Sequence, residues 1–147
     1  MTITIYTDGA CCGNPGPGGW GAWLKYGDHE KKIYGSEAHT TNNRMELMGA
    51  IKALELLKKP SKVELYTDSV YVKNGITVWI HKWLENNWHN ANKDLVKNVD
   101  LWQTLYNISN NHEIKWHWVK GHSMVHGNII ADELACKGKE EAKCLIS

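Results

Sequence analysis

The sequence lacks the apolar segments that mark membrane and exported proteins. No apolar run approaches the ~20 residues that a helix needs to cross a bilayer, and the first residues contain no apolar core of a signal peptide or other targeting segment. These absences argue against a transmembrane protein. We therefore expect a cytoplasmic protein that has no membrane partner.

The sequence also lacks an excess of charge of one sign. The formal net charge is only +1, so no overall basic field points to a polyanionic partner, although a local basic patch can still bind nucleic acid. Nearly all the positive charge is lysine, because Arg44 is the only arginine. A lone arginine inside "TTNNRMELM" therefore draws attention to that segment.

Cysteine is scarce and badly spaced for disulfide or metal chemistry. Cys11 and Cys12 are neighbours, Cys136 and Cys144 lie near the C-terminus, and no Cys-x-x-Cys pair occurs. Adjacent cysteines rarely pair with each other, and zinc sites use a ligand spacing that these residues do not offer. We expect reduced thiols, with a zinc site shared with some of the histidines as the disfavoured alternative.

The residues that are present have an ordinary globular composition. Apolar residues make up 42% and charged residues 22%, which fits one domain over residues 1–147. Alternation predicts strands over residues 2–8, 62–67 and 113–119, and the segments "WGAWLKYG" and "KKIYGSEAHT" should pair antiparallel around "GDHE". The dense glycines and prolines of "GNPGPGGWG" predict a loop.

Helical spacing of apolar residues predicts helices between and after these strands. The longest repeat begins at Asn43 and stops at Lys58-Lys59-Pro60, where basic residues and a proline end a helix. Shorter helices are expected in "SVYVKNGI", "VDLWQTLYNISN" and "NIIADELACKGKEEAK", with a short helix and a loop over residues 77–98. This order predicts an α/β protein with a mixed sheet and helices on its faces.

Two strand-like runs end in the same three residues, in "IYTDG" and again in "LYTDS". Asp8 and Asp68 follow these runs, so we expect the two carboxylates to lie at neighbouring strand ends. Each aspartate also has a local interpretation, because Asp8 precedes Gly9 as in a turn and Asp68 is placed to cap a helix.

Two further carboxylates fall on helix faces that should pack on the sheet. Glu46 shares a helical stripe with Ala50 and Ala53, and Asp132 shares one with Ala135 and Cys136. The local alternatives are a capping box between Asn43 and Glu46, and a favourable helix dipole for Asp132.

Several buried carboxylates at one place would repel each other unless a cation or protons neutralised them. Oxygen ligands without a cluster of histidine or cysteine favour Mg²⁺ or Mn²⁺ over zinc. Such a site, with positions left for water and phosphate, is the arrangement used for phosphoryl transfer. The pattern therefore indicates a divalent metal site built from Asp8, Glu46, Asp68 and Asp132.

The blocks "YTDGACCGNPGPGGWGA", "TTNNRMELMGAIKALE", "YTDSVYV", "KWHWVKGHS" and "ADELA" follow one another as in the type 1 ribonuclease H family, which the chain resembles over nearly its full length. The resemblance implies a ribonuclease H-like fold, a mixed five-stranded sheet with three antiparallel and then two parallel strands, flanked by helices. It also implies hydrolysis of the RNA strand of RNA/DNA hybrids with two Mg²⁺ ions, or Mn²⁺, which leaves 5′-phosphate and 3′-hydroxyl ends. Apart from the resemblance, we expect a monomer, since no heptad repeat or exposed apolar run suggests otherwise.

The same resemblance assigns roles to individual residues. Asp8, Glu46, Asp68 and Asp132 correspond to the metal-binding carboxylates, with Asp8 bridging both ions. His122 corresponds to a histidine for proton movement or product release, and is otherwise an ordinary surface histidine. RNA 2′-hydroxyls distinguish RNA from DNA, and the family residues that contact them correspond to Cys11, Asn14, Asn42 and Asn43. The family residues that hold a DNA-strand phosphate correspond to Thr41 and Asn98.

Three departures from the family pattern bear on affinity and rate. Val70 stands where a glutamine is common, and the loop Leu84–Asp94, which we call the handle loop, is far less basic than usual. Ile129 and Ile130 occupy a segment that usually carries an acidic residue, next to His122. We expect weaker hybrid binding and a changed turnover, with the same reaction.

Three other interpretations remain. A catalytically weak domain that binds hybrids or double-stranded RNA would suit Val70 and the handle loop, but four retained carboxylates argue against it. An integrase-like nuclease would lack the "NPGPGG" and "TTNNRMEL" blocks. A metal-stabilised structural protein would be stabilised by Mg²⁺ without nuclease activity.

Overall fold

The computed structural model describes residues 2–120 and 125–145. A five-stranded sheet in the order β3-β2-β1-β4-β5 forms its centre. The central strand β1 (Thr2–Cys11) runs antiparallel to β2 (Gly16–Tyr26) and parallel to β4 (Lys62–Thr67). On the outside, β3 (His29–Thr40) is antiparallel to β2, and β5 (Glu113–Trp118) is parallel to β4. The predicted mixed sheet is confirmed.

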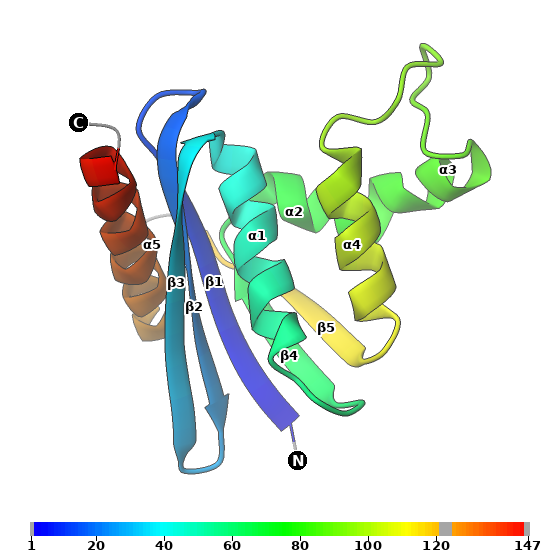
Figure 1. Ribbon diagram of the computed structural model, residues 1–147. Coiled ribbons are helices and arrows are strands. Elements are labelled where there is room, and N and C mark those ends of the chain that lie inside the picture. The colour runs from blue at the N-terminus through cyan, green and yellow to red at the C-terminus, as the bar shows by residue number, and fades with distance from the viewer. Residues whose placement is uncertain (1, 121–124, 146–147) are drawn as a thin grey trace.

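Helices cover both faces of this sheet (Figure 1). On one face α5 (His126–Leu145) packs against β1, β2 and β3, and on the other face α1 (Asn42–Glu55) packs against β1 and β2. α4 (Val99–Ser109) lies beside α1. A chain of short helices leads from β4 to the handle loop: α2 (Val70–Asn74), the π-helical segment η1 (Gly75–Trp79) and α3 (Ile80–Glu85).

The core lies between α1, α4 and the sheet. Leu47 and Leu54 of α1 are fully buried against a cluster that includes Ile5, Leu65 and Trp102. The predicted helical repeat is confirmed, although α1 ends at Glu55, before the predicted stop. Across residues 2–120 and 125–145, no helix combines the length and the apolar character needed to cross a membrane.

The prediction of a loop over "GNPGPGGWG" is wrong for most of that segment, because β2 begins at Gly16. Its glycines allow α5 to approach the strand. A Cβ added at Gly21 would lie 2.7 Å from the carbonyl oxygen of Ala131 and 2.7 Å from the backbone nitrogen of Ala135. Glycine is favoured both in turns and where a helix packs closely on a strand, so a glycine-rich composition alone does not distinguish a loop from such a strand.

Gly21→Ala should therefore lower the free energy of unfolding by about 2–3 kcal/mol, because the backbone of α5 would have to move. Gly49→Ala in α1 is the matched control, since its added Cβ would meet nothing closer than 3.2 Å. The control should keep the wild-type stability to within about 1 kcal/mol. Urea denaturation measures both, and equal stability of the two variants would contradict the packing argument.

Candidate active site

The two Tyr-Thr-Asp stretches lie side by side and in register. Tyr6 of β1 is paired with Tyr66 of β4, and their stacked rings have centroids 4.9 Å apart. This is the last pair of the parallel ladder, so Asp8 and Asp68 each follow it by two residues. The expected proximity of the two carboxylates is confirmed, although Asp8 lies inside β1, which continues along β2 to Cys11.

Glu46 reaches the same point from α1. Its side chain is buried, with 4% exposed, and its Oε1 accepts a hydrogen bond from the backbone N–H of Gly9. A capping box with Asn43 does not form, because Thr41 is the N-cap and its Oγ1 accepts from the backbone N–H of Arg44 at 3.2 Å. Among the described residues, Oε2 of Glu46 has no hydrogen-bond partner. One buried carboxylate oxygen is thus available to a ligand.

Burial and neighbouring charge raise the pKa values of two of these carboxylates, Asp8 and Glu46. Burial raises the pKa of Asp8 to about 7; the neighbouring Glu46 carboxyl opposes this rise and the charge of Asp68 adds to it. Burial, followed by the charge of Asp8, raises the pKa of Glu46 well above its usual range. Without a cation, the pair therefore retains a proton at neutral pH.

These residues fit a hard divalent cation. Carboxylate oxygens of Asp8, Glu46 and Asp68 lie within 4.8 Å of one another, and within residues 2–120 and 125–145 no histidine or cysteine joins them. Such a donor set suits Mg²⁺ or Mn²⁺. In the described part of the chain, the zinc alternative finds no supporting cluster.

Asp68 is available to this site because its neighbour performs the capping that we considered for it. The Oγ of Ser69 accepts from the backbone N–H of Val72 at 3.1 Å and caps α2. The indole N–H of Trp118 donates to the carbonyl oxygen of Asp68 at 3.2 Å, which ties the end of β4 to β5. The carboxylate of Asp68 is thus left to face the other acids.

Asp132 lies at the edge of the site. It borders the same cleft, of about 390 Å³, as Asp8, Glu46 and Asp68. The prediction that it is buried with Ala135 is wrong, because Asp132 is exposed and its oxygens are not within the close group of three. The buried stripe of α5 runs through Ala131 and Ala135, and Asp132 lies about 100° around the helix from Ala131. His122 lies outside the described residues.

Two of the four residues that we expected to contact the RNA strand line this cleft, and the other two lie near them. Asn42 and Asn43 line it from the first turn of α1, and Oδ1 of Asn14 accepts from the backbone N–H of Asn42 at 3.1 Å. Cys11 is half-buried, and its thiol donates to the carbonyl of Thr40 at 3.4 Å. Cys11 is therefore held against β3 at the same end of the sheet.

Thr41 and Asn98, expected to hold a phosphate, are connected by a residue to which sequence reasoning assigned no role. Thr41 caps α1 through the backbone of Arg44, and Nη1 of Arg44 donates to Oδ1 of Asn98 at 3.2 Å. Arg44 also pairs with both carboxylate oxygens of Asp100, at 3.0 and 2.7 Å. The sequence feature that could have pointed to Arg44 is that it is the only arginine.

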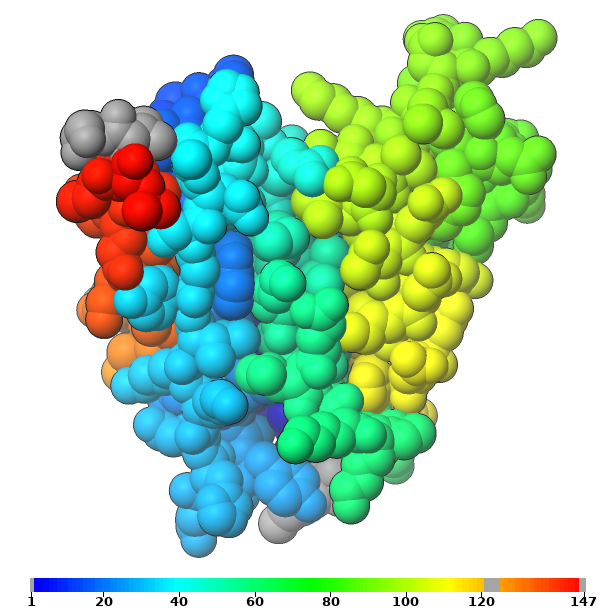
Figure 2. Space-filling view, in the orientation of Figure 1, coloured from blue at the N-terminus to red at the C-terminus, as the bar shows by residue number. Residues whose placement is uncertain are grey.

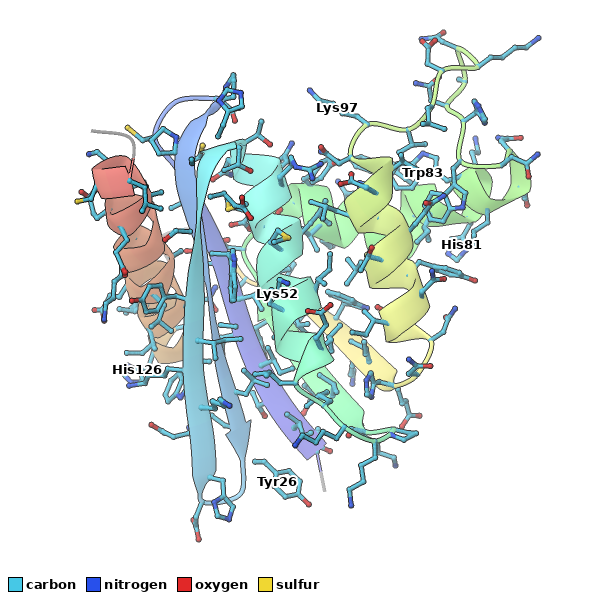
Figure 3. The ribbon with its side chains drawn as sticks, in the orientation of Figure 1. Tyr26, Lys52, His81, Trp83, Lys97 and His126 are labelled. Carbon is cyan, nitrogen blue, oxygen red and sulfur yellow. The ribbon has the colours of Figure 1, made fainter. Side chains whose placement is uncertain are left out.

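The surface is hollowed between the start of α1 and the segment that leads into α4 (Figure 2). Lys97 extends from that segment over the hollow (Figure 3). Lys97 is exposed and precedes Asn98 in the chain, so it adds a positive charge to this segment. An anionic strand that crosses this hollow would therefore meet a lysine as well as the amide of Asn98.

Tryptophans in and before the handle loop pack the short helices against α4. Trp83, labelled in Figure 3, meets Trp102 edge-on with centroids 5.2 Å apart, and Trp88 meets Tyr106 at 6.2 Å. Trp79 stays 38% exposed and packs against Tyr71. Trp79, at the end of η1, is thus the tryptophan of this group that is exposed at the surface.

A family model described as RNase H matches residues 1–140. The chain belongs to the ribonuclease H family. It is 64% identical to the ribonuclease H of Orientia tsutsugamushi over 97% of this chain and 84% of that one, and 59% identical to the ribonuclease HI of Rickettsia prowazekii over 97% of each.

A solved structure is similar as well. The crystal structure of LC9-RNase H1, a type 1 RNase H with the type 2 active-site motif, matches with a TM-score of 0.87 and 31% identity, over 96% of this chain and 73% of that one. The predicted family and the ribonuclease H fold are confirmed.

Proposed function

We propose that this ribonuclease H hydrolyses internal phosphodiester bonds of the RNA strand in RNA/DNA hybrids. The observation that carries the proposal is the convergence of Asp8, Glu46 and Asp68 on one open cleft, with a buried oxygen of Glu46 unpartnered in the described structure. In the reaction the oxygen of a water forms a new bond to phosphorus and the bond from phosphorus to O3′ breaks. The products carry a 5′-phosphate and a 3′-hydroxyl.

The three clustered carboxylates would hold the metal, with Asp132 contributing from the rim of the cleft. Asp8 has Glu46 and Asp68 beside it, so these three carboxylates would together hold the metal. Two Mg²⁺ ions, or Mn²⁺, would supply an activated water and neutralise the charge that develops on the leaving O3′. His122, on the segment before α5, is proposed to move protons or assist product release.

The neighbouring residues are proposed to choose the substrate. Asn14, Asn42 and Asn43 present short amides beside the acidic cleft, close enough to read 2′-hydroxyls in a minor groove. Cys11 is assigned to the same surface. Thr41 and Asn98 would hold a DNA-strand phosphate. The RNA strand would then cross the carboxylates while the DNA strand crosses the hollow.

A matched cleavage assay tests this proposal. One labelled RNA strand is presented alone, paired with complementary DNA and paired with complementary RNA, in Mg²⁺ or in EDTA. We expect internal cleavage only in the hybrid and only with Mg²⁺. Binding of the hybrid without cleavage in Mg²⁺ or Mn²⁺ would favour a binding domain instead.

The handle loop should limit affinity. Glu85 and Asp94 are exposed there and offset Lys82 and Lys93. Glu85→Lys should tighten hybrid binding and steepen the slope of log affinity against log salt by about 0.9, since one phosphate contact is added. Glu30→Lys makes the same charge change near the start of β3, at the end of that strand away from the cleft. It should alter neither the affinity nor the salt slope. Identical salt slopes for the two variants would contradict a role for the handle loop.

A further inference from the structure

The hydroxyl of Tyr71 lies between the acidic cleft and the Arg44–Asn98 pair. Tyr71 lines the cleft together with Asp8 and Glu46. Its oxygen accepts a hydrogen bond from Nδ2 of Asn98 at 3.1 Å and another from the indole N–H of Trp102 at 2.9 Å. Tyr71 is thus the side chain that joins the two parts of the proposed substrate surface.

The directions of these hydrogen bonds follow from chemistry. Arg44 and the indole of Trp102 have only donors. The Oδ1 of Asn98 must therefore face Arg44, which leaves Nδ2 to face Tyr71. The phenol oxygen then accepts two hydrogen bonds, and neither of these partners can accept its own hydrogen. That hydrogen must point away from both.

The side chain of Asn98 does not cap the helix that it precedes. It occupies the N-cap of α4 with a left-handed backbone, φ 61° and ψ 30°, and within the described structure its side chain makes no capping bond. One of its two Nδ2 hydrogens is used by Tyr71. The other is available beside the phenol hydrogen, so two donors lie next to each other.

The phenol is rigidly placed for this purpose. Its ring packs at 5.3 Å from the fully buried ring of Trp102 and at 5.9 Å from Trp79. Two incoming hydrogen bonds polarise the O–H group and strengthen it as a donor. Two fixed donors next to a hollow bordered by Lys97 match the oxygen of an anionic group.

We propose that Tyr71 is a further substrate-binding residue whose O–H, together with Nδ2 of Asn98, donates to one phosphodiester oxygen of the DNA strand. This assignment rests on the proposed function. It adds Tyr71, which also lines the acidic cleft, to the phosphate pocket of Thr41 and Asn98. It couples the grip on the DNA strand to the position of the RNA strand, because one side chain borders both.

The test uses Tyr71→Phe in the full chain and hybrids in which single DNA-strand phosphates are replaced by neutral methylphosphonates. Affinity is measured in EDTA, where binding does not require cleavage, and KM and kcat are measured in Mg²⁺. Against the unmodified hybrid, Tyr71→Phe should weaken binding and raise KM by about 10-fold, with kcat within about twofold of wild type. A methylphosphonate at one position should weaken wild-type binding by about 10-fold and leave the variant nearly unchanged.

Tyr106→Phe is the matched control, because the hydroxyl of Tyr106 makes no hydrogen bond within the described residues. It should behave as wild type with every hybrid. Asn98→Ala shows whether the phenol of Tyr71 donates to the phosphate directly or only holds Asn98 in place. It also keeps the proposal testable if Tyr71→Phe does not fold. In Asn98→Ala the same methylphosphonate should still cost several-fold, since the phenol remains.

Wild-type binding by Tyr71→Phe, or a loss that is the same for every modified phosphate, would overturn the proposal. A methylphosphonate without effect on Asn98→Ala would overturn it as well, because Asn98 alone would then hold the phosphate. Binding in EDTA keeps this result separate from the proposed function, which fails if the wild-type protein binds the hybrid and never cuts it.

Discussion

Asp8→Asn should abolish RNA cleavage and leave hybrid binding intact. The substitution keeps the size of the side chain but removes the charge at the centre of the carboxylate group, where oxygens of three residues lie within 4.8 Å. A metal contributes several kcal/mol of transition-state stabilisation, so we expect the rate to fall by about 10³-fold or more. Cleavage of a labelled hybrid in Mg²⁺ measures the rate, and a shift assay in EDTA measures binding.

The control for this prediction is Asp28→Asn, in the exposed turn between β2 and β3. It removes the same charge at a distance from the cleft and should cut at the wild-type rate. Cleavage by Asp8→Asn at a rate comparable with that of the control would show that the acidic cleft is not the reaction site.

Metal-free protein should lose stability as the pH rises from about 4 to about 8. Burial raises the pKa of Asp8 from 3.8 to about 7, so the folded protein holds a proton that the unfolded chain releases above pH 3.8. The resulting stabilisation is complete below pH 3.8 and is lost as the pH rises through 7. For Asp8 alone the difference corresponds to at most about 4 kcal/mol, and Glu46, whose pKa is raised in the same direction, adds to it.

Urea denaturation at pH 5 and pH 8, in EDTA or in Mg²⁺, measures this effect. Mg²⁺ should restore stability at pH 8, because it replaces the lost proton, and should have little effect at pH 5. Asp8→Asn should remove most of the pH dependence in EDTA, while Asp28→Asn should retain it. Metal-free stability that increases between pH 5 and pH 8 would contradict the account of the buried pair.

The echoed Tyr-Thr-Asp could be interpreted from sequence because strand alternation and parallel pairing leave few alternatives. Once Ile5 and Leu65 are assigned to the buried face, Tyr6 and Tyr66 fall on the other face, and the aspartates follow at the same spacing. The stripe of α1 placed Glu46 toward the sheet for the same reason. Local periodicity therefore predicted the three clustered carboxylates.

Features that depend on contacts between distant segments could not be predicted in this way. Asp132 and Ala135 lie on neighbouring faces of one helix, and only the angle at which α5 meets the sheet decides that Asp132 is exposed. The network of Arg44, Tyr71 and Asn98 joins α1, α2 and the segment before α4. Nothing in the local sequence of any of these elements reveals its partners.

The chemistry of the product ends tests the central claim most directly. Wild-type protein is incubated with an RNA/DNA hybrid and Mg²⁺ in ¹⁸O-labelled water, and the RNA fragments are examined by mass spectrometry. Attack by water at a metal-binding carboxylate site predicts a 5′-phosphate that carries one ¹⁸O and a 3′-hydroxyl on the other fragment. Fragments that end in a 2′,3′-cyclic phosphate would show that the RNA 2′-hydroxyl is the nucleophile, and would contradict a hydrolytic site built from Asp8, Glu46 and Asp68.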